Sequence, residues 1–251
     1  MNNPLSTPRF LAVYSGVLTI IFVATVVMGI SRGALSRRPA FDQITVHRIN
    51  IVESDGIPRI IIADKAEFPG SYYHGKEIAR ADRSDSAGML FINDEGTENG
   101  GLLIGGYKGK DGSLHSWGHL SFDEYEQDQT LDLDTMQDGA DRQTSYRIND
   151  NGDGLLTPQA IEAFAKARKL PAAMPEELAA RRQAMDAVIA EYGLAEHPRA
   201  ALCRQGDKSV ALRLKDVSGH DRIVLSAAAN GTPSMEFLDA GGRITHSWLG
   251  K

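Results

Sequence analysis

Residues 210–225 read VALRLKDVSGHDRIVL, and the pattern of this stretch decides the fold. Apolar and other side chains alternate on both sides of residues 216–219, DVSG, which predicts two β-strands joined by a turn. In that turn Asp216 can close an Asx-turn, and Gly219 can adopt the positive φ that a tight turn requires. The stretch therefore predicts an antiparallel hairpin with one buried and one solvated face.

Two other stretches repeat this order of strand, turn and strand. Residues 44–62 read ITVHRINIV-ESDGIP-RIII, and residues 235–248 read MEFL-DAGG-RITHSW. Shorter apolar runs between them predict more strands, at least nine in all, at 89–92, 102–104, 119–122 and 129–133. Because the first and last blocks share their pattern, we expect them to belong to one antiparallel β-meander domain.

One region departs from the strand pattern. Thr157 is suited to the N-cap of a helix and Pro158 to its first position. A second helix is predicted from Pro175 to Gly193, because glycine commonly terminates helices. The sequence thus predicts a mainly β protein: an N-terminal transmembrane helix, then an antiparallel β-meander domain with a helical-hairpin insert at about 157–193.

Residues 10–30, FLAVYSGVLTIIFVATVVMGI, are the strongest single signal in the chain, with Tyr14 as their one ionisable side chain. A helix of this length is about 31 Å long, which matches a hydrocarbon core of about 30 Å. We expect a single-pass anchor in the lipid bilayer. A cleaved signal peptide is the alternative, but the run is long for one and its cleavage site is poor. The predicted parts are a tail at 1–9, the transmembrane helix at 10–30, a basic linker at 31–40 and the β-rich soluble domain at 41–251.

Two arguments about membrane orientation oppose each other. Arg9 precedes the span, whereas Arg32, Arg37 and Arg38 follow it, and the positive-inside rule then favours a cytoplasmic body. Long C-terminal domains, however, cross the membrane largely regardless of charge. Giving the domain length more weight, we expect an extracytoplasmic body held at the cell membrane as part of the cell envelope.

The charge and the cysteine count exclude several classes of protein. All 33 acids lie beyond residue 40 together with 23 of the 27 basic residues, so that part of the chain carries a formal charge of −10. A body this acidic is a poor partner for phosphate backbones, and we expect no nucleic acid as a partner. The single cysteine, Cys203, excludes an intrachain disulfide framework and a cysteine-based metal cluster.

Four blocks carry a resemblance to a known family. They are FDQITVHRINIVESDGIPRIIIADKAEFPG at 41–70, AGMLFINDEGTENGGLLIGG at 87–106, LSFDEYEQDQTL at 120–131 and RLKDVSGHDRIVLSAAANGTPSMEFLDAGGRIT at 213–245. The chain resembles an uncharacterised bacterial family of β-rich, often membrane-anchored hypothetical proteins. The resemblance covers nearly everything after about Phe41 and implies no activity, substrate or catalytic residue.

A degenerate calcium loop is present at residues 149–154, NDNGDG. With Gly154 at the sixth position of an EF-hand loop, Asn149, Asn151 and Asp153 take the first, third and fifth positions. The twelfth position is Ala160, where an EF-hand has a bidentate Glu. We expect no cofactor, and at most a weak calcium site at these three residues.

Residues 123–141 carry eight acids and no basic residue before Arg142. Leu131 and Leu133 alternate with Asp132 and Asp134, which predicts a strand whose acidic face is solvated. The alternative is a paired-carboxylate active site within this segment. Two nearby histidines, His115 and His119, are interpreted as exposed loop residues, because the sequence offers no further metal ligands beside them.

Two functions follow. We expect a membrane-tethered, non-enzymatic binding or structural module that engages a protein partner or a second copy of itself, because no catalytic set is visible and strand edges recruit partners. The alternative is an envelope hydrolase that uses carboxylates of residues 123–141. A flat apolar strip on the body would favour the binding module. A cleft that holds two or more of Asp123, Glu124, Asp128 and Asp132 would favour the hydrolase.

Overall fold

The computed structural model describes residues 8–34, 40–80, 83 and 85–250, without the side chains of 29–34. The chain divides into two compact units, Met1–Thr45 and Val46–Lys251.

The first unit contains one long apolar helix, α1 (Pro8–Ala34). Its segment Pro8–Met28 is long and apolar enough to cross a membrane, and none of that segment is buried. A signal sequence can have the same length and apolar composition. The hydroxyl groups of Thr19 and Thr25 donate hydrogen bonds to backbone carbonyls four residues earlier, at 2.9 and 2.7 Å. These polar groups are therefore hydrogen-bonded inside the helix. The helix includes residues 8–9 and 31–34, and the rest of the predicted tail and most of the linker lie outside the described residues.

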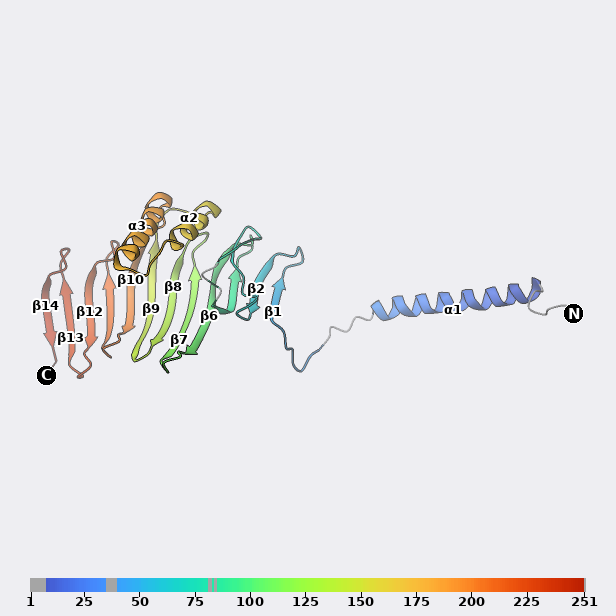
Figure 1. Cartoon of the computed structure of the whole chain (residues 1–251), viewed down its shortest axis with the longest axis horizontal. Helices are drawn as coiled ribbons and strands as arrows, with labels where there is room; N and C mark the ends of the chain where they lie inside the picture. The colour runs from blue at the N-terminus through green and yellow to red at the C-terminus, as the bar shows by residue number, and fades with distance from the viewer. Residues whose placement is uncertain (1–7, 35–39, 81–82, 84, 251) are drawn as a thin grey trace. The chain divides into compact units, whose positions relative to one another are not determined.

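The second unit is built on one large sheet (Figure 1). Within the described residues, twelve antiparallel strands follow one another in chain order, apart from the excursion between β2 and β5. The predicted β-meander is confirmed, and its first and last blocks lie in the same sheet. The strands are β1 (Arg48–Val52), β2 (Pro58–Ala63), β5 (Ala87–Ile92), β6 (Glu98–Lys108), β7 (Leu114–Asp123), β8 (Gln129–Asp138), β9 (Asp141–Asn151), β10 (Glu196–Arg204), β11 (Val210–Lys215), β12 (Asp221–Ala227), β13 (Pro233–Leu238) and β14 (Ile244–Leu249).

The turns close as their residues predict. After β11, the amide of Gly219 donates to the Asp216 carbonyl at 2.9 Å, and an Asp216 carboxylate oxygen accepts from the Ser218 amide at 2.9 Å. Gly219 has a φ of 78°, a conformation that costs glycine little and other residues much. Asp239 closes the turn between β13 and β14 in the same way, accepting from the Gly241 amide at 2.8 Å. The repeated Asp-Gly turns thus fix the connections of the meander.

Two excursions fold back onto one face of the sheet. The first contains the hairpin of β3 (Ser71–Tyr73) and β4 (Lys76–Ile78), and it packs Phe68 and Tyr72 against a buried cluster formed with Ile61 and Leu90. The second is the predicted helical insert, α2 (Pro158–Arg168) and α3 (Pro175–Tyr192), which Figure 1 shows against the sheet near β8–β10. The predicted caps are present, since the Thr157 hydroxyl accepts from the Ala160 amide at 3.3 Å and Gly193 is left-handed.

The fully buried side chains of the large sheet, Ile61, Leu90 and Asp132, lie on the covered face. One row of directly paired residues on that face runs across the sheet through Ile61, Leu90, Gly101, Ser121, Asp132, Arg147, Ala201, Arg213 and Val224. The prediction of a solvated acidic face was wrong, because Asp132 is fully buried whereas its neighbour Leu133 is 45% exposed. The alternation was identified correctly, but the excursions cover the face that carries the acids.

Replacing Ile61 by alanine tests this distribution of the core. Ile61 is fully buried in the cluster beneath the first excursion, so Ile61→Ala should lower the free energy of unfolding by about 2–5 kcal/mol through lost burial and a residual cavity. Ile44→Ala removes the same atoms from an exposed residue outside the sheet and should cost little. Chemical denaturation followed by circular dichroism measures both, and equal effects would contradict this assignment of the core.

Candidate functional site

A cavity of ≈ 460 Å³ lies between the covered face of the sheet and the two excursions. Strands β5–β8 form its floor, helices α2 and α3 lie on the opposite side, and β3 with Arg80 and Arg83 closes one flank. The turn between β7 and β8 also contributes, through residues 126–128. The cavity is therefore assembled from segments that are distant in sequence and share only their position on this face.

The helical side of the cavity is apolar. Ile161 and Phe164 from α2 meet Met185 and Ile189 from α3, and Leu194 follows the second helix. Ile161 and Phe164 are three residues apart and Met185 and Ile189 four apart, so each pair lies on one face of its helix. Apolar walls with a few convergent polar groups are typical of small-molecule sites.

Two carboxylates stand at the ends of neighbouring strands on the polar side. Glu98 begins β6 and forms an ion pair with Arg83 through its Oε1 atom, and Asp123 ends β7. The Glu98 side chain is 18% exposed. The other Glu98 oxygen, Oε2, and the Asp123 Oδ1 atom are buried, and no donor among the described residues reaches either of them. Because buried acceptors are nearly always hydrogen-bonded, each of these two oxygens lacks a bond that a buried carboxylate normally has.

The environment of Asp123 favours its neutral form. Burial raises the pKa of Asp123 to about 8, the negative charges of Glu98 and Asp128 add to the effect, and Arg83 opposes it. Burial, together with Asp128, also raises the pKa of Glu196 across the cavity. The cavity thus has an excess of negative potential, and near neutral pH Asp123 carries a proton that it can donate.

A chain of charged side chains extends from the cavity across three strands. His119, which lines the cavity from β7, contacts Asp134 at 2.6 Å, and Asp134 accepts from Arg147 at 2.7 Å. Arg147 also donates to the buried Asp132 at 2.7 Å, and Asn149 donates to the other oxygen of Asp132 at 3.0 Å. The bond to Asp134 raises the pKa of His119, although burial opposes it. The network gives the fully buried carboxylate its partners and holds the imidazole at the cavity wall.

The predicted loop position of the two histidines was wrong. His115 and His119 both lie in β7, and each contacts an aspartate of the neighbouring strand β8. The Asp138 and Asp134 side chains are therefore cross-strand partners, which sequence alone could not pair with the histidines.

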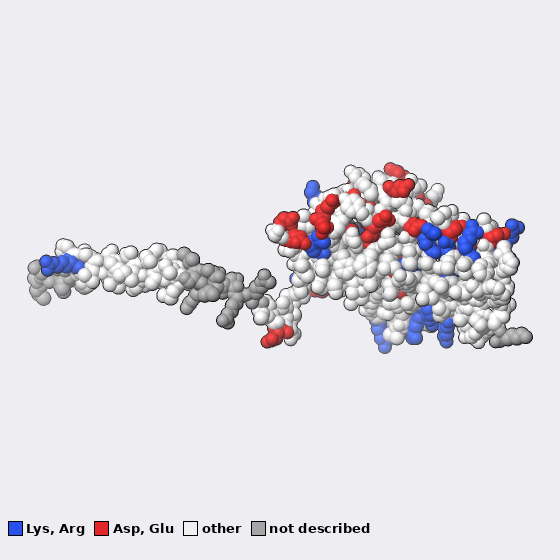
Figure 2. Space-filling model, turned by 180° about the vertical axis from the view of Figure 1, so that it is seen from behind, with Lys and Arg blue, Asp and Glu red and all other residues white. Residues whose placement is uncertain are grey.

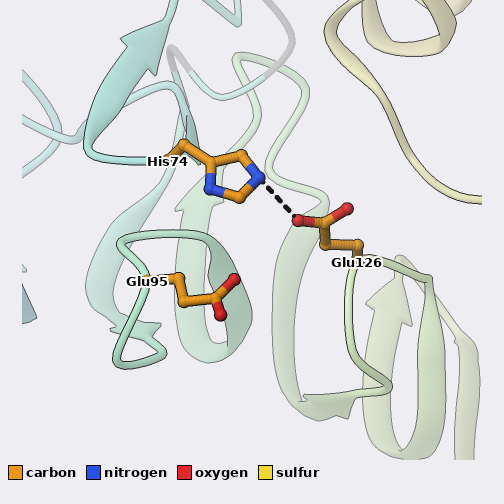
Figure 3. Close-up of side chains that lie close together, drawn as sticks. All are labelled: His74, Glu95 and Glu126. Carbon is orange, nitrogen blue, oxygen red and sulfur yellow. Dashed lines mark ion pairs between the residues drawn. The ribbon is translucent and has the colours of Figure 1, made fainter.

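Three turns at the same end of the strands bring together His74, Glu95 and Glu126 (Figure 3). The His74 Nε2 atom lies 2.7 Å from a Glu126 oxygen, and one ligand atom from each of the three residues lies within 4.8 Å of the others. His74 and Glu126 have left-handed backbones, with φ of 45° and 50°. One imidazole and two carboxylates are donors that zinc or manganese accepts.

Sequence reasoning missed this cluster because its residues are scattered along the chain. The sequence did contain a weak indication that Glu95 and Glu126 lie close together, since every second turn of a meander lies at the same end of the strands. Glu95 and Glu126 lie in two such turns, after β5 and β7, while the turn at His74 is held against the first of them by a bond from the Gly75 amide to the Gly96 carbonyl at 2.9 Å.

The residues of the predicted calcium loop are spread over the end of β9 and beyond. Asn149 is buried, and its amide nitrogen is bonded to Asp132. The Asn151 amide donates to the Asp128 carbonyl at 2.8 Å, and Asp153 is exposed after the strand. A calcium site at these residues stays a prediction.

Both features that were expected to distinguish the two functions are present. The cavity holds Asp123 and Asp128 from the acidic segment, whereas Asp132 and Asp134 belong to the network with Arg147. The opposite face of the sheet carries a strip of exposed apolar side chains, among them Leu133, Tyr146 and Leu202. In comparisons with known proteins, no family model and no curated protein matches the chain. The resemblance to a bacterial family stays a prediction, and the chemistry of the cavity is inferred from its own residues.

Asp123 makes the stability of the fold depend on pH. A carboxyl group whose pKa is higher in the folded than in the unfolded protein destabilises the fold progressively as pH rises from about 4 to about 8, because only the folded state then retains the proton. Asp123→Asn removes this dependence. We expect the variant to match the wild type near pH 4 and to unfold at least about 2 °C higher at pH 8.5.

Differential scanning calorimetry of the full chain in detergent across this pH range measures the difference. The matched control is Asp42→Asn, an exposed aspartate outside the sheet, which should leave the profile of the wild type unchanged. An Asp123→Asn profile parallel to that of the wild type would show that Asp123 is ionised in the fold.

Proposed function

We propose that this protein is a membrane-anchored binding module whose cavity takes a small molecule with an apolar body and a cationic, hydrogen-bond-donating head. The single observation that carries the proposal is the pair of buried oxygens, Glu98 Oε2 and Asp123 Oδ1, which face no donor among the described residues. A donor group on the ligand would satisfy both.

The charges around the cavity support a cationic head. Among the described residues that line it, five are acids (Glu98, Asp123, Glu126, Asp128 and Glu196) and three are arginines (Arg80, Arg83 and Arg168). The raised pKa values of Asp123 and Glu196 have the same two causes, burial first and the nearby negative charges of other carboxylates second. A ligand ammonium group would relieve that repulsion and lower both pKa values.

The size and the apolar wall support a compact ring or short chain as the ligand body. A volume of ≈ 460 Å³ lies within the range of about 300–1,000 Å³ for small-molecule sites. Phe164 and Met185 offer an adaptable apolar surface against such a body.

A hydrolase is the second candidate function, and the protonated state of Asp123 favours it. General acid catalysis needs a proton donor with a pKa near the working pH, and the pKa of Asp123 is about 8. Asp128 lines the same cavity and supplies a second carboxylate. In this case Asp123 would protonate a leaving group, and the loss of that proton would stop turnover without abolishing binding.

Ligand binding is tested with probes that differ in charge alone. We expect benzylamine to raise the unfolding temperature of the full chain in detergent, whereas the neutral benzyl alcohol and the anionic benzoate should not. Glu98→Gln should weaken benzylamine binding by about tenfold or more, because it replaces the charge next to the ligand head. Glu53→Gln, an exposed glutamate in a turn, is the control and should bind as the wild type does.

If all three probes shift the unfolding temperature equally, or if Glu98→Gln binds benzylamine normally, the proposed head-group recognition is wrong. Nitrophenyl glycosides and esters test the second candidate in parallel. Nitrophenol release that Asp123→Asn abolishes would replace the binding module with the hydrolase.

We also propose that α1 anchors the protein in the cell membrane and that the β-rich unit lies on the extracytoplasmic side, in the cell envelope. The length and uniform apolarity of Pro8–Met28 support the anchor. The size of the second unit supports translocation, although the arginines after the span favour the cytoplasm.

Reporter fusions after Lys251 test this orientation in a bacterial host. Alkaline phosphatase folds only outside the cytoplasm, so we expect its fusion to be active and a green fluorescent protein fusion at the same residue to be dark. Release of a shortened, soluble chain would identify α1 as a cleaved signal. Bright fluorescence with inactive phosphatase would place the body in the cytoplasm.

A further inference from the structure

The face of the sheet opposite the cavity carries two uncharged rows of side chains. In each row, the residues of neighbouring strands are paired directly or continue the same line across the sheet. The first row is Ile49, Ile62, Met89, Leu102, Leu120, Leu133, Tyr146, Leu202, Leu212, Leu225, Met235 and Trp248. The second row is Ile51, Ile60, Phe91, Gly100, Phe122, Leu131, Ile148, Ala200, Leu214, Ile223, Phe237 and His246. We call these two rows the apolar strip.

The apolar strip is exposed even at the middle of the sheet. Leu133, Tyr146 and Leu202 are 45%, 41% and 48% exposed, while Asp132 and Ala201 beside them on the covered face are 0% and 6% exposed. Within the described residues, both excursions lie on the other face. Contiguous apolar surface of this extent is rare on monomeric proteins and marks an interaction site.

We propose that the apolar strip is the interface with a second copy of this chain, with the two sheets packed face to face as a β-sandwich. A strip of twelve strands is about 58 Å wide, and two side chains cover about 13 Å along each strand, which gives roughly 750 Å² per copy. Stable protein interfaces bury about 800 Å² per partner, so the full strip, which is the largest area it can contribute, is close to what a dimer needs.

The shape of the strip also fits a second copy. Two sheets pack at about −30° because each is twisted in the same sense, and two identical sheets carry the same twist. A two-fold axis through the strip pairs the same surface on both copies, which is the usual symmetry of homodimers. The middle of the strip falls between β8 and β9, so Leu133 and Tyr146 lie nearest that axis.

The charges around the strip disfavour other occupants. Neither row contains Asp, Glu, Lys or Arg, so a nucleic acid or a charged peptide would find no partner there. Figure 2 shows charged side chains along two opposite edges of the β-rich unit, with a broad uncharged surface between them. A bilayer would have to dehydrate the charged turns at both ends of the strands, such as Lys110 and Lys208 at one end and Asp94 and Glu124 at the other, before the strip reached hydrocarbon. A second sheet that contacts the middle of the strands leaves those turns in water.

Crosslinking in membranes tests the dimer without disturbing the strip. In full-length protein with Cys203→Ser, the variant Leu133→Cys should give a covalent dimer with a short bismaleimide, because the two copies of residue 133 lie near the two-fold axis. Val217→Cys in the same background is the control, since Val217 is 70% exposed but lies in the turn after β11, away from the strip. We expect crosslinked dimer from the first variant and not from the second.

A disruptive variant gives a second readout. Leu133→Lys combined with Leu202→Lys places four charges in the interface of a dimer, whereas in a monomer both side chains would remain in water. We expect light scattering of the detergent-solubilised full chain to show a dimer for the wild type and for Val217→Lys, and a monomer for the double variant with an unchanged circular dichroism spectrum.

Three results would overturn the proposal. The first is the absence of crosslinked dimer from Leu133→Cys in membranes. The second is a crosslinked product at residue 133 that contains a different protein. The third is strong quenching of a fluorophore at residue 133 by spin-labelled lipids, which would mean that the bilayer covers the strip. If the double variant unfolds, the crosslinking of Leu133→Cys still decides between these outcomes.

Discussion

A single-layer sheet has two faces to cover, and the described segments of the β-rich unit cover only one of them. Both excursions from the meander, the one with β3 and β4 and the insert with α2 and α3, return to the same face. The face that the two excursions cover determines where the core lies and where a cavity can form. The other face is the surface that remains for association. An apolar face exposed to water raises the free energy of the folded protein in proportion to its area. A single copy of the chain is therefore stable only if burial on the covered face outweighs this cost.

The covered face combines features that rarely lie together. Near β2 and β5 it is an ordinary apolar cluster around Ile61, whereas near β7–β9 it contains the fully buried Asp132 held by Arg147 and Asn149. Burying a charge without partners would be far more expensive than leaving it in water, so the network is a condition for placing helices over this part of the sheet. The cavity lies where the apolar and the charged parts meet, which explains why one wall suits an apolar ligand body and the other a polar head.

Turns and helix ends could be predicted from a few neighbouring residues. Asp216 with Gly219 closes its turn through its own side chain and backbone, and Thr157 with Pro158 begins α2 through its own hydroxyl. Each of these contacts joins residues within four positions of each other, so the sequence contains everything that forms it. The candidate site is different in kind, because Arg83, Glu98 and Asp123 meet only after three hairpins have formed, and His74 meets Glu126 across fifty-two residues.

The alternation of Leu131 and Leu133 with Asp132 and Asp134 shows where sequence determines structure and where it does not. By itself it determined a strand with two unlike faces, and repetition of such strands with Asp-Gly turns determined an antiparallel meander with a long apolar helix before it. Only the tertiary structure decided which face the excursions cover, and it placed the acids inside. The physical reason is that period-two alternation depends on the backbone pleat alone, whereas burial depends on segments elsewhere in the chain and on the arginine that compensates the buried charge.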